Sequence, residues 1–217
     1  MADGVLPPDS ELLSEVAARA RDSVGRPYLL GIAGPPAAGK STLAQRLAND
    51  LSQGHGLVAR HCPMDGFHLP NERLDALGLR EAKGRIDTFD APGLLAAMQR
   101  LSAKTAFWWP VYSRSRHDPV ADGLRINGNE DVCIVEGNYL FCDAPVWRDI
   151  GDCFHFRMFV DAPDEVLRRR LLERHRSSGR NLDEAVAKIA RIDLPNARKI
   201  RAGKHIAEVV IDDTGSH

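Results

Sequence analysis

The sequence lacks an excess of charge of either sign, a long apolar run and a paired cysteine motif. Its 29 Lys and Arg residues nearly balance 30 Asp and Glu residues, so the composition gives no reason to expect a nucleic acid or a membrane surface as partner. No stretch approaches the roughly 18 apolar residues of a membrane span. The amino terminus, "MADGVLPPDS", has neither the basic start nor the apolar core of a targeting segment. We therefore expect a cytoplasmic protein with small molecules as partners.

Cysteines are few, and none of them forms a C-x-x-C pair. Of Cys62, Cys133, Cys142 and Cys153, three lie in or beside apolar runs, where reduced buried thiols are usual. Internal repeats and low-complexity tracts are absent as well. With 217 residues, 43% of them hydrophobic, the chain can bury one substantial core, and we expect a single domain over residues 1–217.

Short β-rich runs alternate with amphipathic segments along the chain. The strand candidates are "YLLGIAG", "LVARHCPMD", "VCIVEG", "FHFRMFVD" and "AEVVI". Helical patterns occupy residues 10–23, 40–52, 92–102 and 164–176, and the pattern that resumes at residue 182 is expected to break at Leu194-Pro195. This alternation predicts an α/β fold, in which helices cover both faces of a parallel sheet. Residues 66–130 are the least regular part, with one clear helix, and long loops on such a scaffold usually carry a site.

The stretch "GPPAAGKST" follows the first strand candidate and matches the phosphate-binding pattern G-x-x-x-x-G-K-[ST]. Glycines let backbone N–H groups face an anion, Lys40 supplies a positive charge to the outer phosphates, and Ser41 offers a hydroxyl to magnesium. The helix that follows points its positive end at the same place. The predicted nucleotide-binding residues are Gly34, Pro35, Pro36, Ala37, Ala38, Gly39, Lys40, Ser41 and Thr42.

Two carboxylates stand at the ends of strand candidates. The stretch "MDGFH" places Asp65 at the carboxyl end of a strand beside the phosphate loop, where open α/β sheets bind ligands. A carboxylate there can orient and deprotonate an attacking hydroxyl, and the alternative is that Asp65 caps a helix or turn. Glu136 ends the run "VCIVE", close to the phosphates, and its alternative is a structural carboxylate that bonds loop amides. Guanine-specific switches read their base with N-K-x-D, which is absent here because no Asn is followed by Lys.

In these motifs and their order, the sequence resembles the uridine kinase and phosphoribulokinase group of P-loop kinases, and especially its pantothenate-kinase-like and bacterial fructose transport-system-kinase-like members. The resemblance is carried by "GPPAAGKST", "MDGFH", "KGRIDTFD", "PVYSRSRHDP", "VCIVEGNYL", "DEVLRRRLLERHRSSGR" and "DLPNARKI". It implies a P-loop NTPase fold with a five-stranded parallel sheet, ATP with Mg²⁺ as donor and a metabolite hydroxyl as acceptor. It also implies that Asp65 is the general base and that Glu136 acts near magnesium. The oligomeric state is left open, with a homodimer as one option.

Residues 164–181 resemble the helical lid of uridine-kinase-type enzymes, in which arginines close over the triphosphate and neutralise charge during transfer. Arg169, Arg170 and Arg180 match that pattern. We predict that Arg169 and Arg170 bind the nucleotide and that Arg169 takes part in catalysis. Glu173 stands where nucleoside kinases have a basic residue, and a solvated helix face is the alternative for the whole segment.

The irregular middle, residues 66–130, is expected to bind the acceptor. In "PVYSRSRHDP", Arg114 replaces a histidine of the pantothenate-kinase-like pattern and adds a planar fork suited to a carboxylate or phosphate. Sugars and sugar-like acids or phosphates therefore rank first as acceptors, pantothenate second and nucleosides last. We expect Trp108 and Trp109 to pack in the core or at its rim. The predicted acceptor-binding residues are Asp65, His68, Lys83, Arg85, Tyr112, Arg114 and His117.

The sequence thus predicts an ATP-dependent phosphotransferase that moves the γ-phosphate to a hydroxyl of a small metabolite. The alternatives are a nucleoside kinase of the uridine kinase type, a nucleotide-binding regulatory protein without transfer activity and, more distantly, a nucleic-acid-dependent ATPase. For each single His or Arg of the acceptor region, a surface hydrogen bond is the alternative role.

Overall fold

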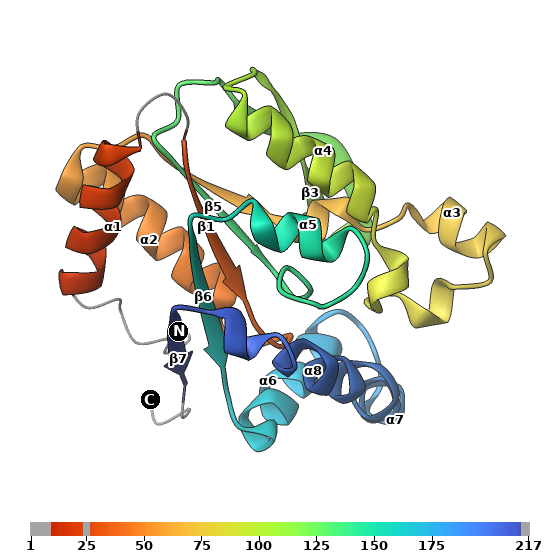
Figure 1. Ribbon diagram of the computed structural model, residues 1–217. Helices are drawn as coiled ribbons and strands as arrows, with labels where there is room; N and C mark the ends of the chain where they lie inside the picture. The colour runs from red at the N-terminus through yellow and green to blue at the C-terminus, as the bar shows by residue number, and fades with distance from the viewer. Residues whose placement is uncertain (1–9, 24–26, 214–217) are drawn as a thin grey trace.

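The computed structural model describes residues 10–23 and 27–213, and at its centre is a parallel β-sheet with strand order β2-β5-β1-β6-β7. Its strands are β1 (Tyr28–Ala33), β2 (Ala59–Pro63), β5 (Val132–Gly137), β6 (Phe156–Asp161) and β7 (Val209–Asp212). The predicted five-stranded parallel sheet is confirmed (Figure 1). Residues 1–9, on which the prediction about a targeting segment rests, lie outside the described residues.

Helices cover both faces of the sheet, as predicted. In Figure 1, α1 and α2 lie on one side of the sheet and α4 and α5 on the other, while α6, α7 and α8 gather near the carboxyl ends of the strands. The helices are α1 (Ser10–Asp22), α2 (Lys40–His55), α3 (Asn71–Ala76), α4 (Ala91–Ser102), α5 (Trp147–Asp152), α6 (Asp164–Ser177), α7 (Leu182–Lys188) and α8 (Leu194–Arg201).

Side chains of the central strands alternate between two hydrophobic cores, one on each face of the sheet. On β1, Leu30 and Ile32 belong to the core formed with α1, α2 and α6. Leu29 and Ala33 belong to the core formed with α4 and α5. Because both faces are covered, every residue of β1 is buried, which explains why the strands appear in the sequence as continuous apolar runs.

Residues 66–130 contain more regular structure than the sequence indicated. Besides the predicted helix, which is α4, they form α3 and an antiparallel hairpin of β3 (Phe107–Ser113) and β4 (Asp118–Ile126). The pairing register shifts between Trp109 and Val111, around Pro110. This irregularity and the proline hide the strand pattern, because Pro within a run normally argues against a strand.

The hairpin packs on the segment that carries Asp65. Trp109 is fully buried, and its Nε1 donates to the backbone oxygen of Pro63 (3.0 Å). Trp109 thus packs in the core as expected, whereas Trp108 is 49% exposed and contacts the Arg125 guanidinium. A Cβ on Gly66 would lie 1.9 Å from the Pro110 oxygen, so only glycine lets β3 approach this closely. The hairpin is therefore fixed directly beside Asp65.

The predicted helix break at Leu194-Pro195 is wrong. The chain remains helical from α7 through a π-helical turn (Ile189–Asp193) into α8. Pro195 falls in the first turn of α8, where a residue without an N–H is tolerated. The wider π turn just before it changes the hydrogen-bond ladder and makes room for the proline ring.

Neither a membrane span nor a disulfide is found in the part of the chain that the structure describes. Within residues 10–23 and 27–213, every helix is too short or too polar to cross a membrane. All four cysteines are free thiols, and Cys62, Cys133 and Cys142 are buried, as expected from their apolar surroundings.

Candidate active site

The phosphate-binding pattern lies between β1 and α2, at the carboxyl edge of the sheet. Gly34 has a φ of 154°, and a Cβ there would lie 2.0 Å from the Val160 oxygen of β6, so only glycine fits. Gly39 has a left-handed backbone (φ 98°) and directly precedes α2. The loop therefore leads into the amino end of a 16-residue helix, whose N–H groups and dipole favour an anion.

Lys40 is the first residue of α2, and its side chain is folded against the loop. Nζ donates to the Pro35 oxygen (2.8 Å) and to Asn138 Oδ1 (2.9 Å), and the residue is buried. Burial lowers the pKa of Lys40 to about 8, although the negative charges of Glu136 and Asp65 act in the opposite direction. The buried ammonium group thus lacks a full counter-charge, which a bound phosphate would supply.

Ser41 and Glu136 form the part of the site that suits a divalent cation. Ser41 Oγ donates to Glu136 Oε1 (2.9 Å), and His61 Nε2 lies 3.4 Å from the same oxygen. Burial on its own would raise the pKa of Glu136, but the contact with His61, the charge of Lys40 and the Ser41 hydroxyl outweigh it and lower that pKa. The carboxylate is therefore ionised at neutral pH.

A hydroxyl and a carboxylate fit Mg²⁺, which keeps several waters and takes its other ligands from substrate phosphates. The described residues contain no group of three or more His, Cys, Asp and Glu side chains that could hold a metal ion by themselves. Any cation at Ser41 and Glu136 would accordingly depend on the nucleotide for its remaining ligands.

Asp65 lies in a 3-10 turn (Met64–Phe67) that directly follows β2. β5, which carries Glu136, lies between β2 and β1, so the ends of three neighbouring strands bring Asp65, Glu136 and Lys40 to one edge. The Asp65 side chain is 42% exposed, and its charge raises the pKa of Lys40. No side chain or backbone N–H of the described chain donates to its carboxylate. The alternative that Asp65 caps a helix or turn gains no support.

Aromatic and basic side chains form a wall beside Asp65. His68 Nε2 lies 4.0 Å from Asp65 Oδ1, and the His68 ring stacks on Phe89 with centroids 3.9 Å apart. Tyr112 lies 5.2 Å from the His68 ring, and Lys83 Nζ lies 5.0 Å from the Tyr112 ring centre. Burial lowers the pKa of His68 to about 4, so its imidazole is neutral at pH 7. Of the predicted acceptor-binding residues, the structure brings Asp65, His68, Lys83 and Tyr112 together.

Lys83 and His117 hold the tip of the hairpin. Lys83 Nζ donates to Asn71 Oδ1 (2.6 Å) and to the backbone oxygen of His117 (2.7 Å), and it lies 3.7 Å from Asp118 Oδ1. Asn71 Nδ2 donates to the same His117 oxygen (2.9 Å). His117 has a left-handed backbone (φ 51°) and an exposed side chain, so it enters this arrangement through its backbone rather than its imidazole.

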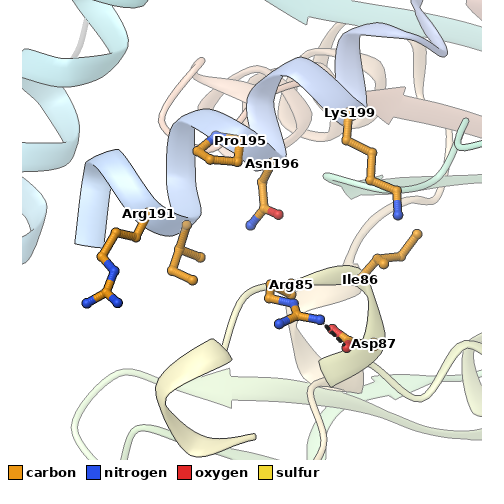
Figure 2. Close-up of a pocket in the computed structure, with 8 residues that line it drawn as sticks. Arg85, Ile86, Asp87, Arg191, Pro195, Asn196 and Lys199 are labelled. Carbon is orange, nitrogen blue, oxygen red and sulfur yellow. Dashed lines mark hydrogen bonds and ion pairs between the residues drawn. The ribbon is translucent and has the colours of Figure 1, made fainter. Parts of the chain in front are cut away.

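Arg85 and Arg114 do not join this wall. Gly84, with a φ of 107°, turns the chain after Lys83, and Arg85 instead pairs with Asp87 (2.7 Å) and lines a separate pocket beside α8 (Figure 2). Arg114 is exposed in the turn between β3 and β4, with no ion pair or hydrogen bond to the described residues. In this arrangement the two arginines lie apart from the wall beside Asp65, and their part in acceptor binding stays a prediction.

The arginines predicted to bind the nucleotide from α6 are also placed differently. Arg170 forms an ion pair with buried Asp213 (2.9 Å), which holds its guanidinium beside the end of β7. Arg169 is exposed, and within the described residues it forms no ion pair. In this arrangement neither side chain contacts the phosphate loop.

Arg174, one turn beyond Arg170, is the α6 arginine whose charge acts on the site. Its positive charge lowers the pKa of Lys40 and contributes to lowering that of His68. Burial raises the pKa of Tyr112, and the charge of Arg180, in the connection to α7, acts against it by a smaller amount. Arg174 and Arg180 are thus the arginines of residues 164–181 whose charge acts on groups of the site, and the predicted roles of Arg169 and Arg170 stay predictions.

Three contacts of the site were not predicted. Asn138, which binds Lys40, stands two residues after Glu136 at the same strand end, and this position was a usable signal. His61 reaches Glu136 through the pairing of β2 with β5, which the sequence does not specify. Lys188 of α7 donates to the Lys83 oxygen (3.0 Å), a contact that depends on how the helices pack on the sheet.

Comparison with known proteins supports the fold and identifies the family. Residues 29–216 match the model of the phosphoribulokinase and uridine kinase family. The uncharacterised protein YggC of Escherichia coli is 34% identical over 204 residues, which are 94% of this chain and 85% of that protein. A pantothenate kinase of Rhodopseudomonas palustris is 33% identical over 65% of this chain, and the match spans only 47% of that enzyme.

A solved structure resembles the chain in both fold and sequence. It is a protein of Silicibacter sp. TM1040 that is provisionally named a fructose transport system kinase. The TM-score is 0.80 and the identity 35%, and the match covers 90% of this chain and 98% of the other.

Proposed function

The chain belongs to the phosphoribulokinase and uridine kinase family of P-loop kinases, and we propose that it transfers the γ-phosphate of ATP to a hydroxyl of a small, polar or anionic metabolite. The observation that carries the proposal is the meeting of Lys40, the Ser41–Glu136 pair and Asp65 at one edge of the sheet. A phosphate site, a cation site and an unengaged carboxylate are the parts that phosphoryl transfer to a hydroxyl requires.

In the proposed reaction, the oxygen of the acceptor hydroxyl attacks the γ-phosphorus of ATP while Asp65 accepts the hydroxyl proton, and ADP leaves. Lys40 holds the outer phosphates through its buried ammonium group. Ser41 and Glu136 would hold Mg²⁺, which would supply charge neutralisation at the phosphates. Arg174 and Arg180 close over the nucleotide from the lid, residues 164–181.

The acceptor is proposed to lie against His68, Tyr112 and Lys83. The ring faces suit a compact carbon skeleton, while Lys83 and the lid arginines give the wall a positive charge that favours a carboxylate or phosphate. Sugars and sugar-like acids or phosphates therefore remain the first acceptors to test, followed by pantothenate and then nucleosides. The free, mostly buried thiols are consistent with a cytoplasmic setting.

We expect Arg114 to help select an anionic acceptor. ADP release is measured with the three acceptor classes for the wild type and for Arg114→Ala. For the preferred acceptor, the Michaelis constant should rise roughly tenfold, with a smaller change in turnover, because a charge-assisted contact in binding is lost. Arg116→Ala removes another exposed arginine from the same turn and serves as the control. An unchanged Michaelis constant in Arg114→Ala, or a neutral nucleoside as the best acceptor, would sink this assignment.

The low pKa of Lys40 predicts that ATP binding weakens in mild alkali. Below about pH 8 the free protein already carries the charged ammonium, so the dissociation constant should stay nearly constant. Above that pH, binding must first protonate Lys40, and the constant should rise by up to about tenfold per pH unit, with proton uptake from the buffer. Calorimetric titration of MgATP from about pH 7 to about pH 9.5 measures both effects. A dissociation constant that is flat over this range would exclude the proposed Lys40–phosphate contact.

A further inference from the structure

A pocket lies between the turn at residues 85–87 and the helical segment of residues 189–201, and it shares no lining residue with the wall beside Asp65. Its volume is about 520 Å³, which is within the range of small-molecule sites. In Figure 2, Asn196 and Lys199 of α8 point toward the turn below them. The pocket is lined by Arg85, Ile86, Asp87, Arg191, Ile192, Pro195, Asn196 and Lys199.

The pocket carries uncompensated positive charge. Asp87 is its one acidic lining residue, and this carboxylate is already paired with Arg85. Arg191 and Lys199 form no hydrogen bond or ion pair within the described residues, so two of the three cations face the cavity without a partner. A negative charge between Arg191 and Lys199 would be attracted by both, so a ligand with two negative charges fits best.

The remaining lining residues indicate a ligand with a carbon skeleton. Ile86, Ile192 and Pro195 present apolar surface. Asn196 is buried, and its Nδ2 donates to the Gly84 oxygen (3.0 Å), which leaves Oδ1 able to accept from a ligand hydroxyl. A dianion with a short, hydroxyl-bearing body matches these groups better than a bare inorganic ion.

Both sides of the pocket are also linked by hydrogen bonds to the segment that carries Lys83, a residue of the wall beside Asp65. Lys188 joins the same helical segment to the Lys83 oxygen, and Tyr139 Oη donates to the Gly84 oxygen (2.7 Å). We propose that this pocket binds a small phosphate monoester as an effector, outside the candidate active site. A ligand that bridges Arg85 and α8 fastens the segment that carries Lys83, and thereby acts on acceptor binding.

The test is a direct binding titration with the full-length chain. The protein is titrated with glycerol 3-phosphate, ribose 5-phosphate and inorganic phosphate at constant ionic strength, with and without Mg²⁺ and a non-hydrolysable ATP analogue. The analogue fills the phosphate loop, and the titration without it keeps the result independent of whether the kinase proposal holds. At least one ester should bind saturably at one site, and more tightly than inorganic phosphate.

Matched variants in the helical segment of residues 189–201 locate the site. Arg191→Ala should weaken ester binding at least about tenfold, because it removes a charge that faces the ligand. Combining it with Lys199→Ala removes a second such charge and should weaken binding further. Arg198→Ala removes an exposed arginine of the same helix that does not line the pocket, and it should change the affinity less than about twofold.

Three results would overturn the proposal. The first is equal weakening by Arg191→Ala and Arg198→Ala, which indicates general surface charge. The second is weak, unsaturable binding that inorganic phosphate matches, which indicates an adventitious ion only. The third is loss of binding in Tyr112→Ala but not in Arg191→Ala, which assigns the ester to the acceptor wall.

Discussion

Asp65→Asn should lower the rate of phosphoryl transfer by roughly 10²-fold or more while ATP binds as tightly as in the wild type, because a positioned general base contributes about this factor to the chemical step. The carboxylate is partly exposed and has no hydrogen bond from the described chain, so its replacement by an amide should leave the unfolding temperature unchanged. Steady-state turnover, ATP titration and thermal unfolding of the same preparation measure the three quantities.

Asp75→Asn is a matched control for Asp65→Asn. Asp75 is also exposed and pairs with Arg80 outside the site, so its replacement should leave turnover near the wild-type value. If Asp65→Asn lost both ATP affinity and thermal stability, Asp65 would have a structural role instead.

Lys40→Ala should reduce transfer to the background rate and weaken nucleotide binding. The variant removes the buried ammonium that lies against the phosphate loop, and loss of one such charged donor costs about 10²- to 10³-fold in turnover alone. Turnover and calorimetric titration of MgATP measure the two effects.

Lys40→Met separates charge from packing, because methionine keeps most of the side-chain volume. Burial lowers the pKa of Lys40, so its charge does not stabilise the free protein, and the unfolding temperature of Lys40→Met should not fall. Retained turnover in a folded Lys40→Met variant would remove Lys40 from the proposed mechanism.

The sheet and the phosphate loop were predictable because each leaves a local mark on the sequence. Strands covered on both faces are short and apolar throughout, as in β1, and helices between them keep one apolar stripe. The loop needs glycine at Gly34 and Gly39 for steric reasons that no other residue satisfies. These constraints act within a few residues, so a single sequence reveals them.

The arrangement of the arginines was not predictable from local patterns. Helical spacing shows that Arg170 and Arg174 lie on similar sides of α6, but not that Asp213, far along the chain, pairs with Arg170. Arg85 is directed away from Lys83 by the backbone of a single residue, Gly84. Both outcomes depend on tertiary contacts, whereas spacing describes one element at a time.

The hairpin and the continuous helix were missed for a related reason. Proline normally ends a strand or a helix, yet Pro110 is accommodated at a register shift and Pro195 behind a π turn. Each irregularity is stabilised by its surroundings, including the burial of Trp109. The sequence alone contains the proline but not the structure that compensates for it.

Phosphorus NMR of a reaction mixture tests the central claim most directly. The full-length chain is incubated with MgATP and, in separate samples, with sugars, sugar acids, sugar phosphates, pantothenate and nucleosides. We predict that one class produces a new phosphorylated-acceptor resonance in amounts equal to the ADP formed, and that the Asp65→Asn variant produces it at least about 10²-fold more slowly. ADP formed together with inorganic phosphate at the same rate in every sample, or no ADP in any of them, would contradict transfer to a metabolite hydroxyl.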